Sequence, residues 1–129
     1  MSIFLAHAAR IILGLIFLVA GLNGWAVILG MEPFAPTSPQ AMALLTGYLL
    51  VLEKSTEVVC GLLLVCNRFL PAALAILAPI VANILLFHLF SDPALLPLAI
   101  LVTLLETFLL FMYRESFKPL LKKNAKPGR

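Results

Sequence analysis

Four ionisable side chains interrupt segments that are otherwise long and apolar, and they are the residues best suited to chemistry. They are Glu53, Lys54, Glu57 and Glu106. A charged side chain at the centre of a bilayer costs about 2.5–3.5 kcal/mol on insertion scales, so such residues face a protein interior or a wet cavity. There a carboxyl group can hold or exchange a proton, and an ammonium group can donate hydrogen bonds to a carbonyl-type ligand.

Further polar residues fall at similar depths on the helices that must position these groups. At a rise of about 1.5 Å per residue, Asn23 and Asn83 lie roughly 10 Å inside the outer boundary of the membrane. His88 lies near the outer mouth. We expect one ligand-binding pocket, mostly apolar with a few convergent polar groups, formed by Asn23, Lys54, Glu57, Asn83, His88 and Glu106.

The same residues also have purely structural interpretations, which the sequence leaves open. Lys54 and Glu57 lie three residues apart and can neutralise each other as a structural polar pair. Asn23 and Asn83 can hydrogen-bond between helices, as amides in membrane proteins do. His88 can be an interfacial side chain or relay protons between the pocket and the outer water.

The composition places the chain in a membrane. It has 129 residues, of which 63% are hydrophobic and 12% charged, and a mean hydropathy of +1.12. A soluble domain needs far more polar surface. At about 20 residues per span, four helices nearly exhaust the length, so we expect a single all-α domain, a four-transmembrane-helix bundle. The predicted spans are residues 10–30, 39–66, 69–90 and 93–113, followed by a basic tail over 114–129.

The basic residues predict the topology. Outside Lys54 they fall before the first span at Arg10, between the second and third at Arg68, and after the fourth. The other two connections carry only the acids Glu32 and Asp92. This alternation is the positive-inside pattern, with both termini cytoplasmic. The basic tail suits anionic lipid headgroups, and without interleaved aromatic residues it does not indicate a nucleic-acid partner.

Small residues predict how two of the helices pack. Gly14 and Gly21 share a face of the first span with Arg10, while Gly47 and Gly61 share one with Lys54 on the second. Glycines let transmembrane backbones approach closely, so we expect these two helices to pack along these faces.

No motif of a soluble enzyme occurs. Cys60 and Cys66 point to different sides of one helix, and no His/Cys cluster indicates a metal site. The chain has no phosphate-binding loop, dinucleotide fingerprint or nucleophile elbow, so catalytic residues are unknown and no intrinsic cofactor is evident. Whether the protein is an enzyme stays open.

Several short motifs, in order and spacing, resemble a known family. They are Arg10-Ile-Ile-Leu-Gly14, Ala20-Gly21-Leu22-Asn23, Lys54-Ser-Thr-Glu57, Asn67-Arg68-Phe69-Leu70-Pro71 and Pro79-Ile-Val-Ala-Asn83. Over nearly its whole length the chain resembles the DoxX-like family of small four-helix integral membrane proteins. Members often carry a lysine directly after the position of Asn23, where this chain has Gly24, and Glu53 looks like an addition to the more usual Lys54 and Glu57.

The resemblance implies a membrane redox context. Family names derive from membrane subunits associated with quinone-linked sulfur oxidation, and related four-helix proteins act as assembly factors. The leading hypothesis is a bacterial inner (cytoplasmic) membrane protein that binds a small lipophilic or redox ligand, with quinone as a candidate. It would work with a membrane or peripheral redox partner protein, and it could form a homo-oligomer. The alternatives are a non-catalytic membrane assembly or interaction subunit and a proton-coupled small-solute carrier.

Overall fold

The computed structural model describes residues 2–128, and within that range the chain folds into helices without strands. The prediction of an all-α fold is therefore confirmed. The helices are α1 (Ile3–Ile28), α2 (Pro39–Leu44), α3 (Tyr48–Cys66), α4 (Leu70–Phe90), η1 (Pro93–Leu95), α5 (Leu96–Met112), η2 (Arg114–Ser116) and η3 (Lys118–Leu121).

Three helical segments of the described chain are long and apolar enough to cross a membrane. They are Ile3–Ile28, Leu70–Phe90 and Pro93–Met112. The remaining long helix, α3, has 19 residues and carries Glu53, Lys54 and Glu57. The described chain thus has three candidate membrane-spanning helices, and α3 differs from them by its charged turn.

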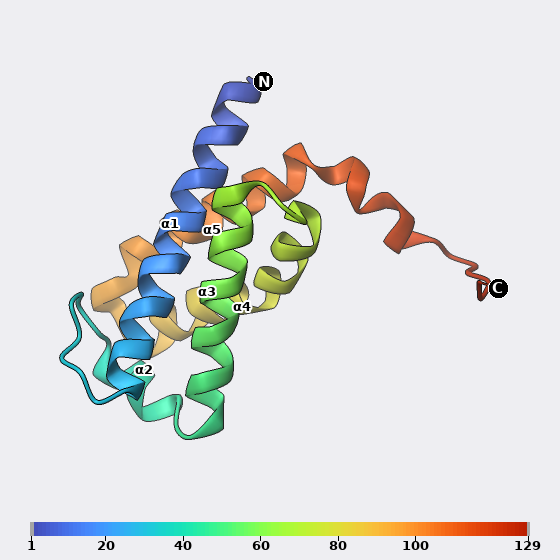
Figure 1. Cartoon of the computed structure of the whole chain (residues 1–129). Helices are drawn as coiled ribbons and strands as arrows, with labels where there is room; N and C mark the ends of the chain where they lie inside the picture. The colour runs from blue at the N-terminus through green and yellow to red at the C-terminus, as the bar shows by residue number, and fades with distance from the viewer. Residues whose placement is uncertain (1, 129) are drawn as a thin grey trace.

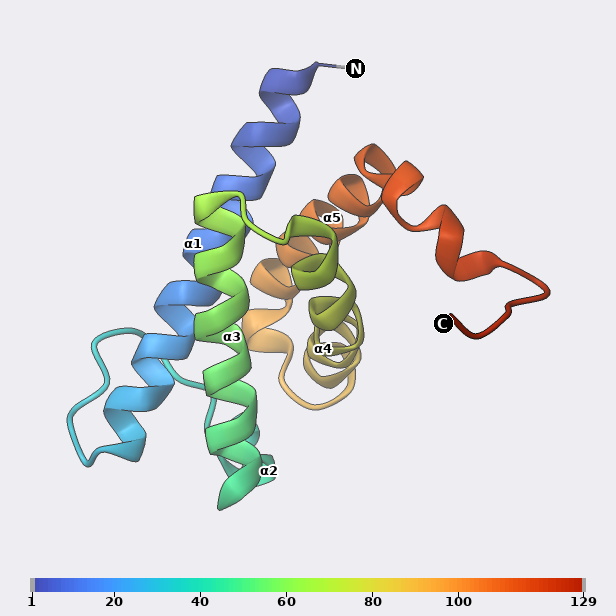
Figure 2. The ribbon, with the colours of Figure 1, turned by 45° about the vertical axis from the view of Figure 1, so that its right-hand side comes forward.

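The four long helices form an antiparallel bundle in which each contacts the next around a ring. α1 packs against α3 and α5, and α4 packs against α3 and α5. The N-terminus lies at the same end as the α3–α4 turn and the end of α5 (Figures 1 and 2). The α1–α3 connection, which includes α2, lies at the opposite end (Figure 1).

Two boundaries differ from the spans predicted from the sequence. α1 begins at Ile3 instead of Arg10, because the Ser2 side chain caps the helix by accepting a hydrogen bond from the Phe4 N–H at 3.0 Å. The helix predicted over residues 39–66 begins where expected, with Ser38 as its cap, but it is interrupted after Leu44. The chain resumes a helix at Tyr48, after Gly47.

Gly47 explains the interruption. Its φ of 58° and ψ of −134° lie in a region that side chains disfavour, so the backbone turns there instead of continuing one helix. A Cβ added at Gly47 would meet nothing within 4 Å. The prediction that Gly47 packs against a neighbouring helix is therefore wrong.

The core and the outer surface are both apolar. The largest fully buried side chains are Phe17, Leu13, Leu64, Leu74, Leu77, Leu109 and Cys60. The outer face of α1 exposes Ile12, Leu15, Val19 and Leu22 as well. A contiguous apolar exterior of this kind suits contact with lipid.

Candidate functional site

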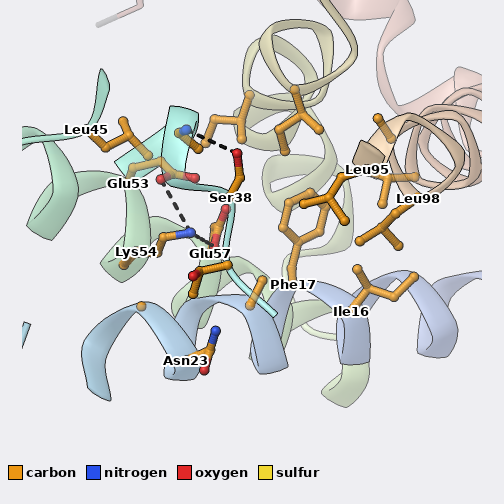
Figure 3. A pocket seen from close by; sticks show the side chains of 18 of the residues that line it. Ile16, Phe17, Asn23, Ser38, Leu45, Glu53, Lys54, Glu57, Leu95 and Leu98 are labelled. Carbon is orange, nitrogen blue, oxygen red and sulfur yellow. Dashed lines mark hydrogen bonds and ion pairs between the residues drawn. The ribbon is translucent and has the colours of Figure 1, made fainter. Parts of the chain in front are cut away.

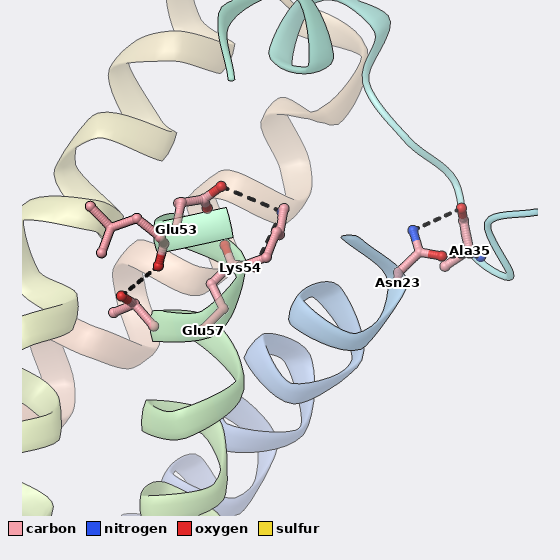
Figure 4. A network of polar contacts seen from close by, with 7 residues as sticks. Asn23, Ala35, Glu53, Lys54 and Glu57 are labelled. Carbon is pink, nitrogen blue, oxygen red and sulfur yellow. Dashed lines mark hydrogen bonds and ion pairs between the residues drawn. The ribbon is translucent and has the colours of Figure 1, made fainter. Parts of the chain in front are cut away.

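A charged cluster on α3 lies inside the bundle. The Lys54 ammonium nitrogen lies 3.2 Å from Glu57 Oε1 and 3.6 Å from Glu53 Oε2. The Glu57 side chain is only 3% exposed, and the other two are 16% and 18% exposed. One lysine thus holds two carboxylates together, as Figures 3 and 4 show.

Glycines on α1 and α3 bring these helices into close contact. A Cβ on Gly14 would lie 2.9 Å from Leu64 Cβ, and one on Gly61 would lie 2.7 Å from the Leu18 backbone nitrogen. A Cβ on Gly21 would lie 2.9 Å from the Val58 backbone nitrogen. These three glycines form the α1–α3 interface, where their missing side chains allow backbone to approach backbone.

The same interface positions Lys54. A Cβ on Gly24 would collide with the Lys54 side chain, whose Cε would lie 2.7 Å away. The aliphatic stem of Lys54 therefore occupies the space above Gly24, and its ammonium group is directed to the two glutamates.

Asn23 anchors a loop that we call the strap (residues 30–38). Its Oδ1 accepts hydrogen bonds from the backbone N–H groups of Phe34 at 2.8 Å and Ala35 at 3.0 Å. Its Nδ2 donates to the Ala35 carbonyl at 3.1 Å, a contact drawn in Figure 4. Both acceptor positions of this amide oxygen are used, so Asn23 positions the strap and has no free acceptor for a ligand.

A second polar contact ties the strap to the turn between α4 and α5. The Ser38 hydroxyl donates to Asp92 Oδ2 at 2.5 Å, and both residues are buried. His88 Nδ1 lies 3.5 Å from the same carboxylate oxygen and 3.2 Å from the Asp92 carbonyl oxygen. No local sequence pattern predicts the Ser38–Asp92 contact, because these residues are 54 positions apart.

A cavity of about 750 Å³ lies between these contacts and is lined by α1, the strap, α2, α3, α4 and α5. Five of the six residues predicted for the pocket line it, namely Asn23, Lys54, Glu57, Asn83 and His88. Glu53 and Ser38 line it as well. In Figure 3 the charged cluster lies at one side of the cavity, Ile16, Leu95 and Leu98 lie at the other, and Phe17 lies between them.

Glu106 does not belong to this lining. It lies on α5 one helical turn beyond Val102, which does line the cavity. Glu106 is 2% exposed, and neither of its carboxyl oxygens has a hydrogen-bond partner. The structure therefore separates Glu106 from the pocket in which the sequence analysis placed it.

Arg10 has a role that its position before the first predicted span did not indicate. Its Nη1 donates to the carbonyl oxygens of Leu64 at 2.6 Å and Val65 at 2.9 Å, and the residue is 7% exposed. Those carbonyls lie in the last turn of α3, where backbone N–H partners run out, and the Leu64 carbonyl also accepts the Asn67 N–H at 3.4 Å. Arg10 thus caps α3 from α1, on the face that it shares with Gly14.

No group of three or more His, Cys, Asp or Glu side chains suited to a metal ion occurs within residues 2–128. At the basic end of α5, the Arg114 guanidinium lies 4.4 Å above the Phe111 ring and donates to the Phe111 carbonyl.

The fold and site define a small helical protein with helices that are long and apolar enough to cross a membrane, and with a cavity among them. Comparison with protein-family models gives no match, and comparisons with curated proteins and with solved structures give none either.

Proposed function

We propose that the chain is a four-span integral protein of a bacterial inner membrane, with α3 as the fourth span and both termini cytoplasmic. Two features support this topology. α3 lies antiparallel along α1 with its charged residues turned toward the interior, so the charges do not prevent it from crossing. The ends that carry Arg68 and Arg114 lie with the N-terminus, as the positive-inside rule requires (Figure 1).

Within that membrane we propose that the protein binds a small lipophilic ligand. The observation that carries this proposal is the cavity of about 750 Å³, with apolar walls and a charged cluster at one side. Known small-molecule sites are concave, mostly apolar and of about 300–1,000 Å³. Its lining includes Leu15 and Leu98, which are also exposed on the outer surface, so a ligand dissolved in lipid has a short path inward.

A quinone is the candidate ligand that the resemblance to DoxX-like proteins suggests, in a membrane redox system with a partner protein. Of the three N–H groups of Lys54, one donates to Glu57, so a donor remains for a ligand, and Asn83 and His88 offer further polar groups on the cavity wall. The chain would supply binding and orientation, and electron transfer would need the bound ligand and a partner.

The test is ligand binding by the purified full-length protein in nanodiscs. Native mass spectrometry should detect a retained lipophilic molecule, and titration with a short-chain quinone should saturate at one site per chain. Ala20→Phe, which fills part of the cavity, should weaken binding. Ala82→Phe is the matched control, because Ala82 is exposed and does not line the cavity. Absence of any retained or titrated ligand would refute the proposed function.

The buried Lys54–Glu57 contact favours one second candidate, a non-catalytic assembly or interaction subunit whose charged cluster only holds helices together. In that case the double change Lys54→Met with Glu57→Leu should leave the protein folded and active in the cell. Either single change should destabilise it, because a lone buried charge is left without its partner.

A further inference from the structure

The cavity wall contains more hydrogen-bond acceptors than donors among its ionisable groups. Those groups are Glu53, Lys54, Glu57 and His88. His88 Nδ1 is directed at Asp92, outside the lining. Two carboxyl groups therefore face one ammonium group, and the cluster has one negative charge in excess when all three are ionised.

The ammonium group forms an ion pair with both carboxylates but a hydrogen bond with only one of them. Lys54 Nζ donates a hydrogen bond to Glu57 Oε1, while its 3.6 Å distance to Glu53 Oε2 is an ion pair without a hydrogen bond. Glu53 Oε2 is buried and has no hydrogen-bond partner. The close fit of the Lys54 stem over Gly24 holds the ammonium group in this arrangement. A carboxylate that is removed from water, and one of whose oxygens accepts no hydrogen bond, is stabilised by a further donor.

The rest of the cavity wall indicates the chemistry of the ligand that carries such a donor. Beyond the charged cluster most of the wall is apolar, with Phe17 in the middle and Ile16, Leu95 and Leu98 farther away (Figure 3). An aromatic face such as that of Phe17 also tolerates a nearby cation. A ligand that matches both parts has a donating head and an apolar body.

We propose that the cavity binds an apolar molecule with a protonated amine head group, which donates hydrogen bonds to the carboxylates of Glu53 and Glu57. This inference rests on the proposed function, the binding of a small lipophilic ligand, and specifies its chemistry. The added cation balances the excess negative charge and supplies a donor to the carboxyl group of Glu53, which lines the cavity. A quinone offers only acceptors at the same place and therefore fits the cluster less well.

Three probes with one apolar body test the head group. They are 1-naphthylmethylamine, 1-naphthylmethanol and 1-naphthoate, which present a cation, a neutral hydroxyl and an anion to the full-length protein in nanodiscs. Calorimetry against empty nanodiscs corrects for partition into lipid. We expect the amine to bind about tenfold more tightly than the alcohol, from the difference between charged and neutral hydrogen bonds. The carboxylate should bind most weakly.

Glu53→Gln tests the contact itself and should lower amine affinity about tenfold while leaving alcohol affinity unchanged. Glu106→Gln is the matched control, because it makes the same change at a buried carboxyl group outside the lining and should affect neither probe. Circular dichroism would show whether Glu53→Gln folds. If it does not, the comparison of the three probes on the unaltered protein still tests the amine proposal.

The two proposals fail separately. If the alcohol, the carboxylate or a quinone binds as tightly as the amine, the amine proposal is overturned and the ligand-binding function stands. If none of these molecules binds, the proposed function is overturned as well.

Discussion

Replacement of Arg10 by methionine should destabilise the protein by about 2 kcal/mol. Arg10 Nη1 makes two short hydrogen bonds, to the carbonyl oxygens of Leu64 at 2.6 Å and Val65 at 2.9 Å. In soluble proteins a hydrogen bond to a charged group contributes about 1.5–3 kcal/mol. Contacts between transmembrane helices average about 0.6 kcal/mol. The two Arg10 hydrogen bonds lie near a helix end, so we expect their combined contribution to stability to fall between these limits. A loss of about 2 kcal/mol lowers the folded-to-unfolded ratio roughly 30-fold.

The assay is equilibrium unfolding in mixed micelles of increasing sodium dodecyl sulfate, followed by circular dichroism. Arg68→Met is the matched control, since it removes the same charge from the same end of the bundle at an exposed residue. We expect the control to change the free energy of unfolding by less than about 0.5 kcal/mol. Arg10→Lys should fall between the two, because an ammonium group keeps the charge without the fork of donors. If the two methionine variants unfold alike, the cap that Arg10 provides to α3 has no energetic role.

Four further changes test the interface, the cluster and the strap. Gly61→Ala places a Cβ 2.7 Å from a backbone nitrogen of α1 and should cost about 1–3 kcal/mol in the same unfolding assay, whereas Gly128→Ala, with nothing within 4 Å, should cost nothing measurable. Lys54→Met should lower the unfolding midpoint by leaving the Glu57 carboxylate unpaired, and adding Glu57→Leu should restore much of the loss. Asn23→Ala should speed hydrogen exchange at the Phe34 and Ala35 amides by at least tenfold while other amides keep their rates. Glu106→Gln should change stability by less than about 1 kcal/mol, since neither oxygen accepts a hydrogen bond, and a larger loss in thermal unfolding would contradict the unpartnered geometry.

Features set by neighbouring residues could be predicted from the sequence. Ser38 and Pro39 form a cap and first turn, and the helix begins there because the Ser38 hydroxyl accepts from the Ala41 N–H at 3.1 Å. Asn67 ends α3 with a left-handed conformation, which suits the two-residue connection between the predicted spans 39–66 and 69–90. Apolar composition alone was enough to indicate helices that can cross a membrane.

Features set by tertiary contacts could not be predicted from the sequence. Nothing near Gly47 in the sequence distinguishes a glycine that packs from one that turns the chain, and the structure shows the second. Helical spacing indicates that Glu106 faces inward, but it does not show which inner surface another helix covers. Asn23 was expected at the pocket and lines it, yet its amide is committed to the strap, a partner that only the fold reveals.

The vacant position above Gly24 also determines which helix can supply a positive charge to this cavity. The Lys54 stem fills that vacancy, so a longer residue at position 24 and the present conformation of Lys54 exclude each other. A lysine at this site would have to displace the Lys54 stem, and it would add a second ammonium group, supplied from α1. Exchanging one small residue would thereby match two cations to the two carboxylates and give an otherwise unchanged bundle a different ligand preference.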